Sequence, residues 1–212
     1  MKQLSDSVLK HLRNKKATVL DSETYTKFAI FVPLIELNHE LHFIFQVRSR
    51  LVRQPGEVCF PGGKVDKTDP TVKYAAIREL SEELGVPPAD AEILGELDYL
   101  VTPFRLMLFP FIGILPPDTA FNINKDEVED IFYVPVSQLL NMEPKEHYIK
   151  LEAVPEDNFP YHLIPNGENY NWRTGVINEQ FYEHQNYVIW GLTARILTHA
   201  LKELHPTDNQ TK

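Results

Sequence analysis

The chain has little cysteine, no long apolar run and no excess of positive charge. Cys59 is the single cysteine in 212 residues, which excludes an internal disulfide and agrees with a reducing compartment. No apolar run approaches the roughly 18 residues of a membrane span, and the N-terminal residues lack the apolar segment of a signal peptide. We therefore expect a cytoplasmic protein with no membrane partner.

The formal net charge of -9 argues against a protein that covers nucleic acid through a general basic field. A small anionic ligand is compatible with this charge, because a divalent cation and a few basic side chains can reverse the potential inside a cleft. The basic residues are unevenly distributed, and Arg48, Arg50, Arg53 and Lys64 all lie close in sequence to the stretch 56–86. This grouping favours a phosphate-bearing small molecule, although a solvated surface loop could have the same composition.

The length and the hydrophobic share of 43% allow one domain with a substantial core. We expect an N-terminal helix and lead-in over residues 1–24, a single domain over 25–204 and a flexible tail over 205–212. Within the domain, the stretch 145–187 is rich in aromatic residues and broken by turn residues, which favours a hairpin-like insertion.

The first quarter of the chain predicts a helix followed by a hairpin. Residues 4–13 carry apolar side chains at helical spacing, which favours a helix that packs on the domain. The β-rich runs 28–37 and 41–47 are separated by a polar turn, which favours an antiparallel pair. Pro33 interrupts the first run, so we expect that strand at a sheet edge or with a bulge.

Strand-like runs and helices also follow in the second half of the chain. Tyr161, Tyr170 and Trp172 are expected to pack in the core or in a lid rather than to stack on bases. The apolar stripe of residues 188–204 predicts a C-terminal helix. Further strands are expected at 92–102, 105–115 and 126–134, and a short helix at 136–142.

The stretch over residues 56–86 organises the rest of the sequence. Asp69 suits a helix N-cap, Pro70 suits the first helical position and Gly85 suits a C-terminal stop. A helix over 70–84 is therefore expected. Before it, a short strand that contains Cys59, a small buried hydrophobe rather than a reactive thiol, leads into a Gly-Gly turn where the backbone can approach a ligand closely.

One side of this helix is apolar and an adjacent side is acidic. Glu79, Glu82 and Glu83 lie at i, i+3 and i+4, where like charges repel and weaken an exposed helix. Two interpretations stay open. Arg78 can offset the repulsion on a solvated acidic face, or the three carboxylates hold a metal ion.

Gly63, followed by residues 78–86 (RELSEELGV), resembles the Nudix box, G-x5-E-x7-R-E-U-x-E-E-x-G-U with U apolar. The second half matches at every defined position. Arg78 lies one residue further from Gly63 than the pattern implies, and the acid nearest to the pattern's isolated glutamate is Asp69. The resemblance implies an α/β fold, a Nudix-like α/β/α sandwich with a mixed β-sheet and a catalytic loop-helix-loop.

Nudix enzymes use Mg²⁺ or Mn²⁺ to hydrolyse a nucleoside diphosphate linked to another moiety. Carried over by position, the resemblance implies that Glu79, Glu82 and Glu83 bind the metal together with the carbonyl of Gly63. Mg²⁺ prefers oxygen ligands and keeps several waters, so a few carboxylates at one helix edge suffice. For the catalytic base or a further metal ligand we favour Glu127, with Glu129 and Glu57 as alternatives.

Residues 48–63 resemble the motif L-L-T-x-R-[SA]-x3-R-x3-G-x3-F-P-G-G of the coenzyme A pyrophosphatase branch of the family. The interval between Arg53 and Gly56 is one residue short of that motif. Residues 126–128 and 190–194 are also similar to that branch. The 3′-phosphate of coenzyme A gives additional arginines a physical role, since guanidinium groups bind phosphate in a bidentate manner.

We therefore expect Arg48 and Arg53 to bind phosphate, with Arg50 and Lys64 as weaker candidates. The function implied is hydrolysis of coenzyme A or acyl-CoA to 3′,5′-ADP and (acyl-)4′-phosphopantetheine. The alternatives are a Nudix hydrolase of ADP-ribose or a dinucleotide, and a Nudix-fold binding module without catalysis. A homodimer is an expectation from the family alone.

Overall fold

The computed structural model describes residues 4–205. The helices are α1 Asp6–Asn14, α2 Val72–Leu84, α3 Val136–Leu140 and α4 Gly191–Leu204. The strands are β1 Thr26–Leu37, β2 Glu40–Arg48, β3 Val58–Cys59, β4 Gly62–Lys64, β5 Glu92–Glu96, β6 Leu100–Val101, β7 Leu106–Leu115, β8 Val128–Pro135, β9 Lys145–Leu151, β10 Gly175–His184 and β11 Tyr187–Trp190. Turns of 3₁₀ helix lie at Ser22–Thr24, Pro88–Asp90, Tyr161–Leu163 and Gly167–Asn169.

The main sheet has the order β3-β2-β1-β7-β5, with β4 also paired to β1, β6 to β7 and β8 to β2. The pair β1 and β7 is parallel and the other pairs are antiparallel, so the sheet is mixed. The predicted pair of runs 28–37 and 41–47 is present as β1 and β2. The other predicted strands and the short helix are present as β5 to β8 and α3.

Both faces of the sheet are buried, which makes the fold an α/β/α sandwich. On one face Val32, Phe43 and Phe45 pack with the apolar side of α4. On the other face Phe31 and Ile44, together with residues of β7, pack with α2. Consecutive strand residues therefore serve opposite cores, as expected for strands covered on both sides.

Pro33 lies inside the sheet, so its predicted position at an edge is wrong. The strand β1 pairs with β7 along one side. On the other side it pairs with β4 through residues 28–30 and with β2 from Leu34 onward. Pro33 falls in the interval between these two partners, where the missing N–H removes no hydrogen bond to β2 or β4.

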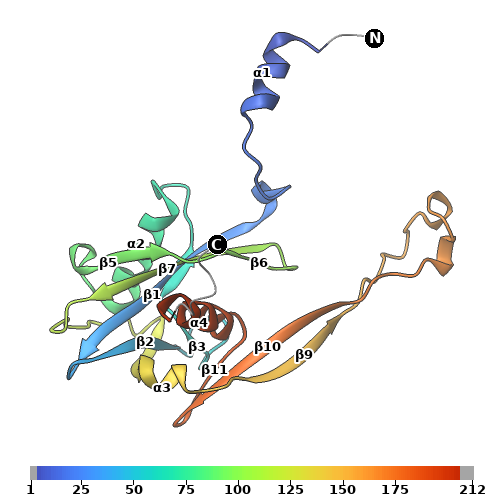
Figure 1. Cartoon of the computed structure of the whole chain (residues 1–212). Helices are drawn as coiled ribbons and strands as arrows, with labels where there is room; N and C mark the ends of the chain where they lie inside the picture. The colour runs from blue at the N-terminus through green and yellow to red at the C-terminus, as the bar shows by residue number, and fades with distance from the viewer. Residues whose placement is uncertain (1–3, 206–212) are drawn as a thin grey trace.

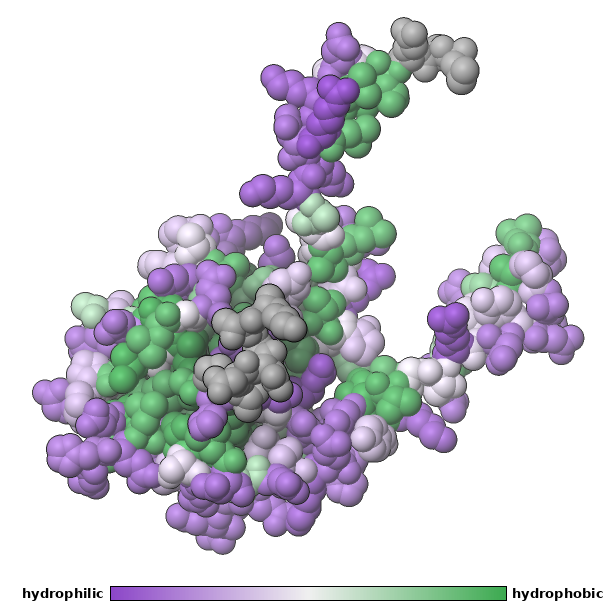
Figure 2. Space-filling view, viewed as in Figure 1, coloured by the Kyte–Doolittle hydropathy of each residue, from purple (hydrophilic) through white to green (hydrophobic). Residues whose placement is uncertain are grey.

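The helix α1 forms within the predicted range but does not pack on the domain, so that part of the prediction is wrong. It stands away from the body at the end of an extended lead-in (Figure 1). None of its residues is buried, and Leu12 is 56% exposed. Its apolar side chains form one stripe that faces solvent (Figure 2). The helix is amphipathic because of its sequence, but no neighbouring element covers its apolar side.

Deleting residues 4–16 is expected to change the free energy of unfolding by only about 0.5 kcal/mol or less, because no buried contact is lost. The midpoint of thermal unfolding should move by about 2 °C or less. Scanning calorimetry of the shortened chain checks this, with Leu80→Ala as a positive control, since a fully buried leucine should cost about 2–5 kcal/mol. A large fall on deletion would mean that α1 packs on the domain in solution.

The stretch 145–187 folds as a hairpin of β9 and β10 that projects from the body, with β11 paired to the base of β10 (Figure 1). Near its tip, Tyr170 and Trp172 lie 4.9 Å apart between ring centroids, and Phe159 contacts both Tyr161 and Trp172. These aromatic residues pack on one another away from the body. Packing in the main core is therefore wrong for them, whereas a lid role stays a prediction.

The C-terminal helix is shorter than predicted. Residues 188–190 belong to β11, and α4 begins at Gly191. Ile196, Leu197 and Leu201 are buried as the stripe predicts, whereas Leu192 is exposed. Of the predicted flexible tail, residues 206–212 lie outside the described residues. Over residues 4–205 no helix is both long and apolar enough to cross a membrane.

Candidate functional site

The helix α2 begins two residues later than predicted, because Thr71 caps it instead of Asp69. The Thr71 hydroxyl oxygen accepts a hydrogen bond from the amide of Tyr74 at 3.0 Å. Gly85 ends the helix as predicted, in a left-handed conformation with φ of 70°. The buried side of α2 fixes the helix on the sheet and consists of Ala75, Ala76, Leu80, Glu83 and Leu84.

Asp69 anchors Arg78 instead of capping the helix. Arg78 donates from Nε and Nη2 to the two carboxylate oxygens of Asp69, each at 3.0 Å, and the Asp69 side chain is 2% exposed. These hydrogen bonds lower the pKa of Asp69 and raise that of Arg78. Asp69 thus occupies the place of the isolated acid of the box, with a shorter side chain and one more residue before the arginine.

The same guanidinium also contacts two of the predicted metal ligands. Arg78 Nη1 lies 2.7 Å from Glu79 and 2.9 Å from Glu82. The Glu79 carboxylate lies against the backbone of Gly63, because a Cβ added at Gly63 would come within 2.4 Å of Glu79 Oε2. The structure thus places Glu79 against the Gly63 backbone, and Arg78 joins Glu79 to Glu82.

Glu83 is the most buried acid of the site, with 4% exposure. Its Oε2 accepts a hydrogen bond from the amide of Gly62 at 2.9 Å. Burial raises the pKa of Glu83 to about 8, and the charges of Glu79 and Glu127 act in the same direction. Burial likewise raises the pKa of Glu79, with further increases from Glu82 and Glu127. The four carboxylates therefore share one electrostatic environment.

Glu127 reaches this environment from a different element, the loop before β8. The amide of Asn124 in this loop donates to the carbonyl of Glu83 at 2.9 Å. On the other side, the amide of Ser49 donates to the carbonyl of Glu127 at 2.9 Å. The loop of Glu127 is thus fixed between the end of α2 and the connection from β2 to β3 over residues 48–57, which we call the arginine-rich loop. Of the two alternatives, Glu129 lies beside Arg50 and Glu57 lies beside Arg48.

The donor set fits a hard divalent cation. Carboxylate and carbonyl oxygens are the ligands that Mg²⁺ and Mn²⁺ prefer, and Mg²⁺ sites need only a few of them because waters complete the shell. Over residues 4–205 no three His, Cys, Asp or Glu side chains are close enough to hold an ion as they stand. The Arg78 guanidinium lies between Glu79 and Glu82. Binding would therefore require these two carboxylates to turn toward the ion.

The predicted phosphate-binding residues are not all brought to the acids. Arg48 closes the arginine-rich loop through a hydrogen bond from its Nε to the carbonyl of Arg53 at 2.9 Å, and Arg53 is exposed on that loop. Arg50 is 87% exposed and lies 4.0 Å from Glu129. The Lys64 side chain lines a separate hollow beside residues 23–27. Arg48 and Arg53 flank Ser49, whose amide contacts the carbonyl of Glu127, and they stay the predicted phosphate-binding residues.

Gln46 is a polar residue of this region that the sequence analysis missed. It is 1% exposed and donates from Nε2 to the Cys59 sulfur at 3.5 Å, whereas its Oε1 is buried without a hydrogen-bond partner within residues 4–205. Burial raises the pKa of Cys59 to about 11, consistent with an inert thiol. The available signal was a glutamine inside an otherwise apolar strand, since buried amides need partners.

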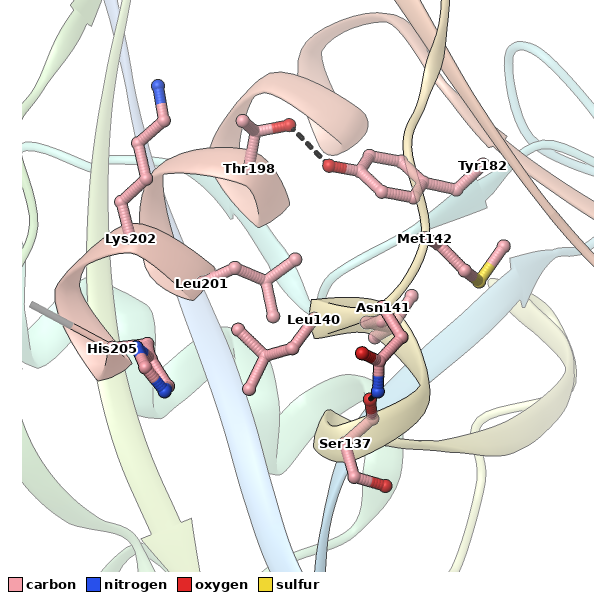
Figure 3. Close-up of a pocket in the computed structure, with 10 residues that line it drawn as sticks. Ser137, Leu140, Asn141, Met142, Tyr182, Thr198, Leu201, Lys202 and His205 are labelled. Carbon is pink, nitrogen blue, oxygen red and sulfur yellow. Dashed lines mark hydrogen bonds between the residues drawn. The ribbon is translucent and has the colours of Figure 1, made fainter. Parts of the chain in front are cut away.

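A hollow of about 590 Å³ between α3 and α4 is separate from these acids (Figure 3). Across it, the Tyr182 and Thr198 hydroxyl groups are hydrogen-bonded at 2.8 Å. The remaining walls are apolar and polar side chains of α3, of α4 and of the residues that directly follow each helix, including Leu140, Asn141, Leu201, Lys202 and His205. None of the predicted site residues lines this hollow.

Known proteins provide independent information on this fold. The chain is similar to the peroxisomal coenzyme A diphosphatase NUDT7 of Mus musculus, with 34% identity over 171 residues, which span 80% of this chain and 66% of that protein. It is also similar to an uncharacterized Nudix hydrolase, NudL, of Escherichia fergusonii, with 31% identity over 80% of this chain and 78% of the relative.

Among solved structures, a MutT/nudix family protein from Enterococcus faecalis has a similar fold. The TM-score is 0.54 at 12% identity, and the match covers 96% of this chain and 70% of that one. The NUDIX domain family matches residues 26–156, which include the whole loop-helix contact and the loop of Glu127. The chain therefore belongs to the Nudix family.

Proposed function

We propose that this protein is a metal-dependent hydrolase that cleaves the pyrophosphate bond of coenzyme A or acyl-CoA. The products are 3′,5′-ADP and 4′-phosphopantetheine or its acylated form. The observation that carries this proposal is the convergence of Glu79 and Glu83 on the Gly62 and Gly63 backbone, with Glu82 joined to Glu79 through Arg78, next to the arginine-rich loop. The similarity to a relative named coenzyme A diphosphatase supports the choice of substrate.

The acids and the glycine carbonyl hold Mg²⁺ or Mn²⁺, which neutralises pyrophosphate charge and lowers the pKa of the attacking water when bound. The Gly62 amide keeps Glu83 in place through its hydrogen bond. Asp69 and Arg78 hold the loop against the helix, so that the spacing between Gly63 and Glu79 is maintained.

Glu127 acts as the base that accepts a proton from water as its oxygen attacks one phosphorus. The bond from that phosphorus to the bridging oxygen breaks, and the bridging oxygen leaves on the other phosphate. Arg48 and Arg53 bind the phosphates of the nucleotide half, where guanidinium groups offer paired donors. The exposed position of Glu127 gives water access to its carboxylate.

Incubation of the purified protein with coenzyme A and Mg²⁺ or Mn²⁺, followed by mass spectrometry of the products, tests the proposal. We expect 3′,5′-ADP and 4′-phosphopantetheine, and none of either after chelation with EDTA. ADP-ribose and a diadenosine polyphosphate belong in the same experiment. Faster cleavage of either one would indicate the alternative Nudix hydrolase, and binding without any cleavage would indicate a non-catalytic module.

Arg53→Ala should raise KM for coenzyme A by about tenfold or more, because a hydrogen bond to a charged group contributes about 1.5–3 kcal/mol. Its side chain is exposed and has no contact that the fold requires. Dephospho-coenzyme A, which lacks the 3′-phosphate, serves as the matched substrate. An equal rise in KM for both substrates would show that Arg53 does not bind the 3′-phosphate.

A further inference from the structure

A second pocket, which we call the side pocket, lies beside the arginine-rich loop and has a volume of about 440 Å³. Its walls come from the loop between β6 and β7, from β10, from the start of α4, and from Gln54 and Glu57. This volume is within the usual range for small-molecule pockets, which is about 300–1,000 Å³. None of the four acids proposed to act in hydrolysis lines it.

The side pocket gathers large apolar side chains that are incompletely buried. Phe104 is 65% exposed, Trp190 39% and Leu192 37%, although each belongs to this one hollow. Leu106 and Ile177 complete the apolar lining. Exposed apolar groups gathered in a concave site favour binding of an apolar ligand group.

The carboxylate of Glu179 is one of several polar groups in the lining of the side pocket, the others belonging to Gln54, Glu57, Thr102, Thr193 and Arg195. The Oε2 of Glu179 is buried from solvent and has no hydrogen-bond partner within residues 4–205. A Cβ added at Gly191 would lie 3.6 Å from this oxygen, which places it beside the first residue of α4. A buried polar atom without a partner requires an explanation, and a carboxylate can only accept hydrogen bonds. A ligand with an N–H or O–H donor would satisfy it after the carboxylate turns into the pocket.

A short stretch of chain that includes β3 joins a residue of the side pocket to a residue that contacts the acids. Glu57 lines the pocket, and the charge of Arg48 acts on it. From Glu57 the chain runs through β3 to Gly62, whose amide contacts Glu83. Five residues of extended chain span at most about 18 Å. A ligand that reaches from the acids into the pocket therefore needs a chain no longer than about five extended residues.

We propose that the side pocket binds the pantetheine arm of the substrate and the acyl group of its thioester, with Glu179 as acceptor for a pantetheine amide. This inference takes its ligand from the proposed function. The arm is a flexible chain about as long as four to five extended residues, has geminal methyl groups and carries two amide N–H donors. The lining carries two carboxylates, Glu57 and Glu179, and one guanidinium, Arg195, so its charge is negative on balance and the pocket suits the uncharged half of the substrate better than a phosphate.

Tryptophan fluorescence provides a test that does not depend on hydrolysis. The chain has two tryptophans, and Trp172 lies near the hairpin tip, so Trp172→Phe leaves Trp190 as the reporter. Titration with S-hexanoyl-pantetheine is expected to change Trp190 emission saturably, whereas 3′,5′-ADP should not. Saturable binding of 3′,5′-ADP at Trp190, or no response to S-hexanoyl-pantetheine, would overturn the assignment.

Two variants in the same background test the residues. Glu179→Leu removes the hydrogen-bond acceptor and keeps a side chain of similar size. Phe104→Ala removes an aromatic side chain that lines the pocket and is mostly exposed, so the fold should not depend on it. Each should raise the Kd of S-hexanoyl-pantetheine by about tenfold. Circular dichroism and an unchanged thermal midpoint establish that the variants are folded. Unchanged Kd values for both folded variants would overturn the proposal.

The kinetics separate this inference from the proposed function. If coenzyme A is hydrolysed but S-hexanoyl-pantetheine does not bind, the pocket assignment fails and the function stands. If S-hexanoyl-pantetheine binds with the expected dependence on Glu179 but coenzyme A is not cleaved, the proposed function fails and the assignment of the pocket stands. With an active enzyme, Glu179→Leu should raise KM for hexanoyl-CoA about tenfold and leave kcat within about twofold.

Discussion

Replacing Glu83 by glutamine is expected to lower the turnover of coenzyme A by about a thousandfold or more. The loss of a charged ligand removes several kcal/mol of transition-state stabilisation, and about 4 kcal/mol corresponds to a thousandfold. Glutamine has the shape of glutamate and keeps an oxygen that can accept the hydrogen bond from Gly62. The measurement is kcat with Mg²⁺ and with Mn²⁺ for the parent and for Glu83→Gln.

The same substitution should leave the free energy of unfolding of the metal-free protein unchanged or higher. Glu83 is 4% exposed, and a buried carboxylate costs more to desolvate than an amide. If the variant loses activity but is at least as stable as the parent, the loss comes from impaired metal binding and not from unfolding. Glu152→Gln, a change at an exposed acid after β9, is the control and should alter neither quantity. Turnover of Glu83→Gln within tenfold of the parent would contradict the role of Glu83 as a metal ligand.

Gly63→Ala is expected to reduce turnover by at least about a hundredfold. A displacement of a catalytic group by about 1 Å can reduce the rate by about this factor. The added Cβ would come 2.4 Å from both Cδ and Oε2 of Glu79, a distance that carbon atoms do not reach in proteins. The Glu79 carboxylate has to move away from the glycine carbonyl, which separates two of the proposed metal ligands. Steady-state kinetics and the Mn²⁺ affinity of the variant measure both effects.

Gly95→Ala is the matched control for the glycine substitution. Gly95 lies in β5, and a Cβ added there would meet nothing within 4 Å. We expect this variant to fold and to turn over like the parent. If Gly63→Ala also retained full turnover and Mn²⁺ affinity, the close packing of Glu79 on Gly63 would have no part in catalysis.

Features determined by nearby residues were predicted well. The hairpin of β1 and β2, the acidic side of α2 and the end of that helix at Gly85 follow from periodicity and turn chemistry. The start of α2 was missed because Asp69 satisfies Arg78 and leaves the cap to Thr71. An aspartate can serve as a helix cap or as a salt-bridge partner. Its residue type does not distinguish the two roles, and only the three-dimensional contact shows which one Asp69 has.

Features determined by distant residues were predicted less well. The place of Pro33 depends on β4 and β2 sharing one side of β1, and the sequence of β1 alone does not contain that information. The exposure of α1 differs from the prediction, because an amphipathic pattern indicates an apolar side but does not show whether another element packs on it. Glu127 was chosen by resemblance, and its electrostatic coupling to Glu79 and Glu83 appears only when the loop before β8 is in place.

The contact between Asp69 and Arg78 shows how side-chain length and chain length compensate each other. The aspartate is one methylene shorter than the glutamate of the usual box, and one more residue separates it from the arginine. Deletions and substitutions in this loop should therefore be tolerated in pairs rather than singly. Asp69→Glu combined with removal of residue 70 or 71, which lie between Asp69 and the start of α2, is the pair that restores the usual spacing. A search pattern for this family that lets the acid and the interval vary together would recover relatives that a fixed spacing rejects.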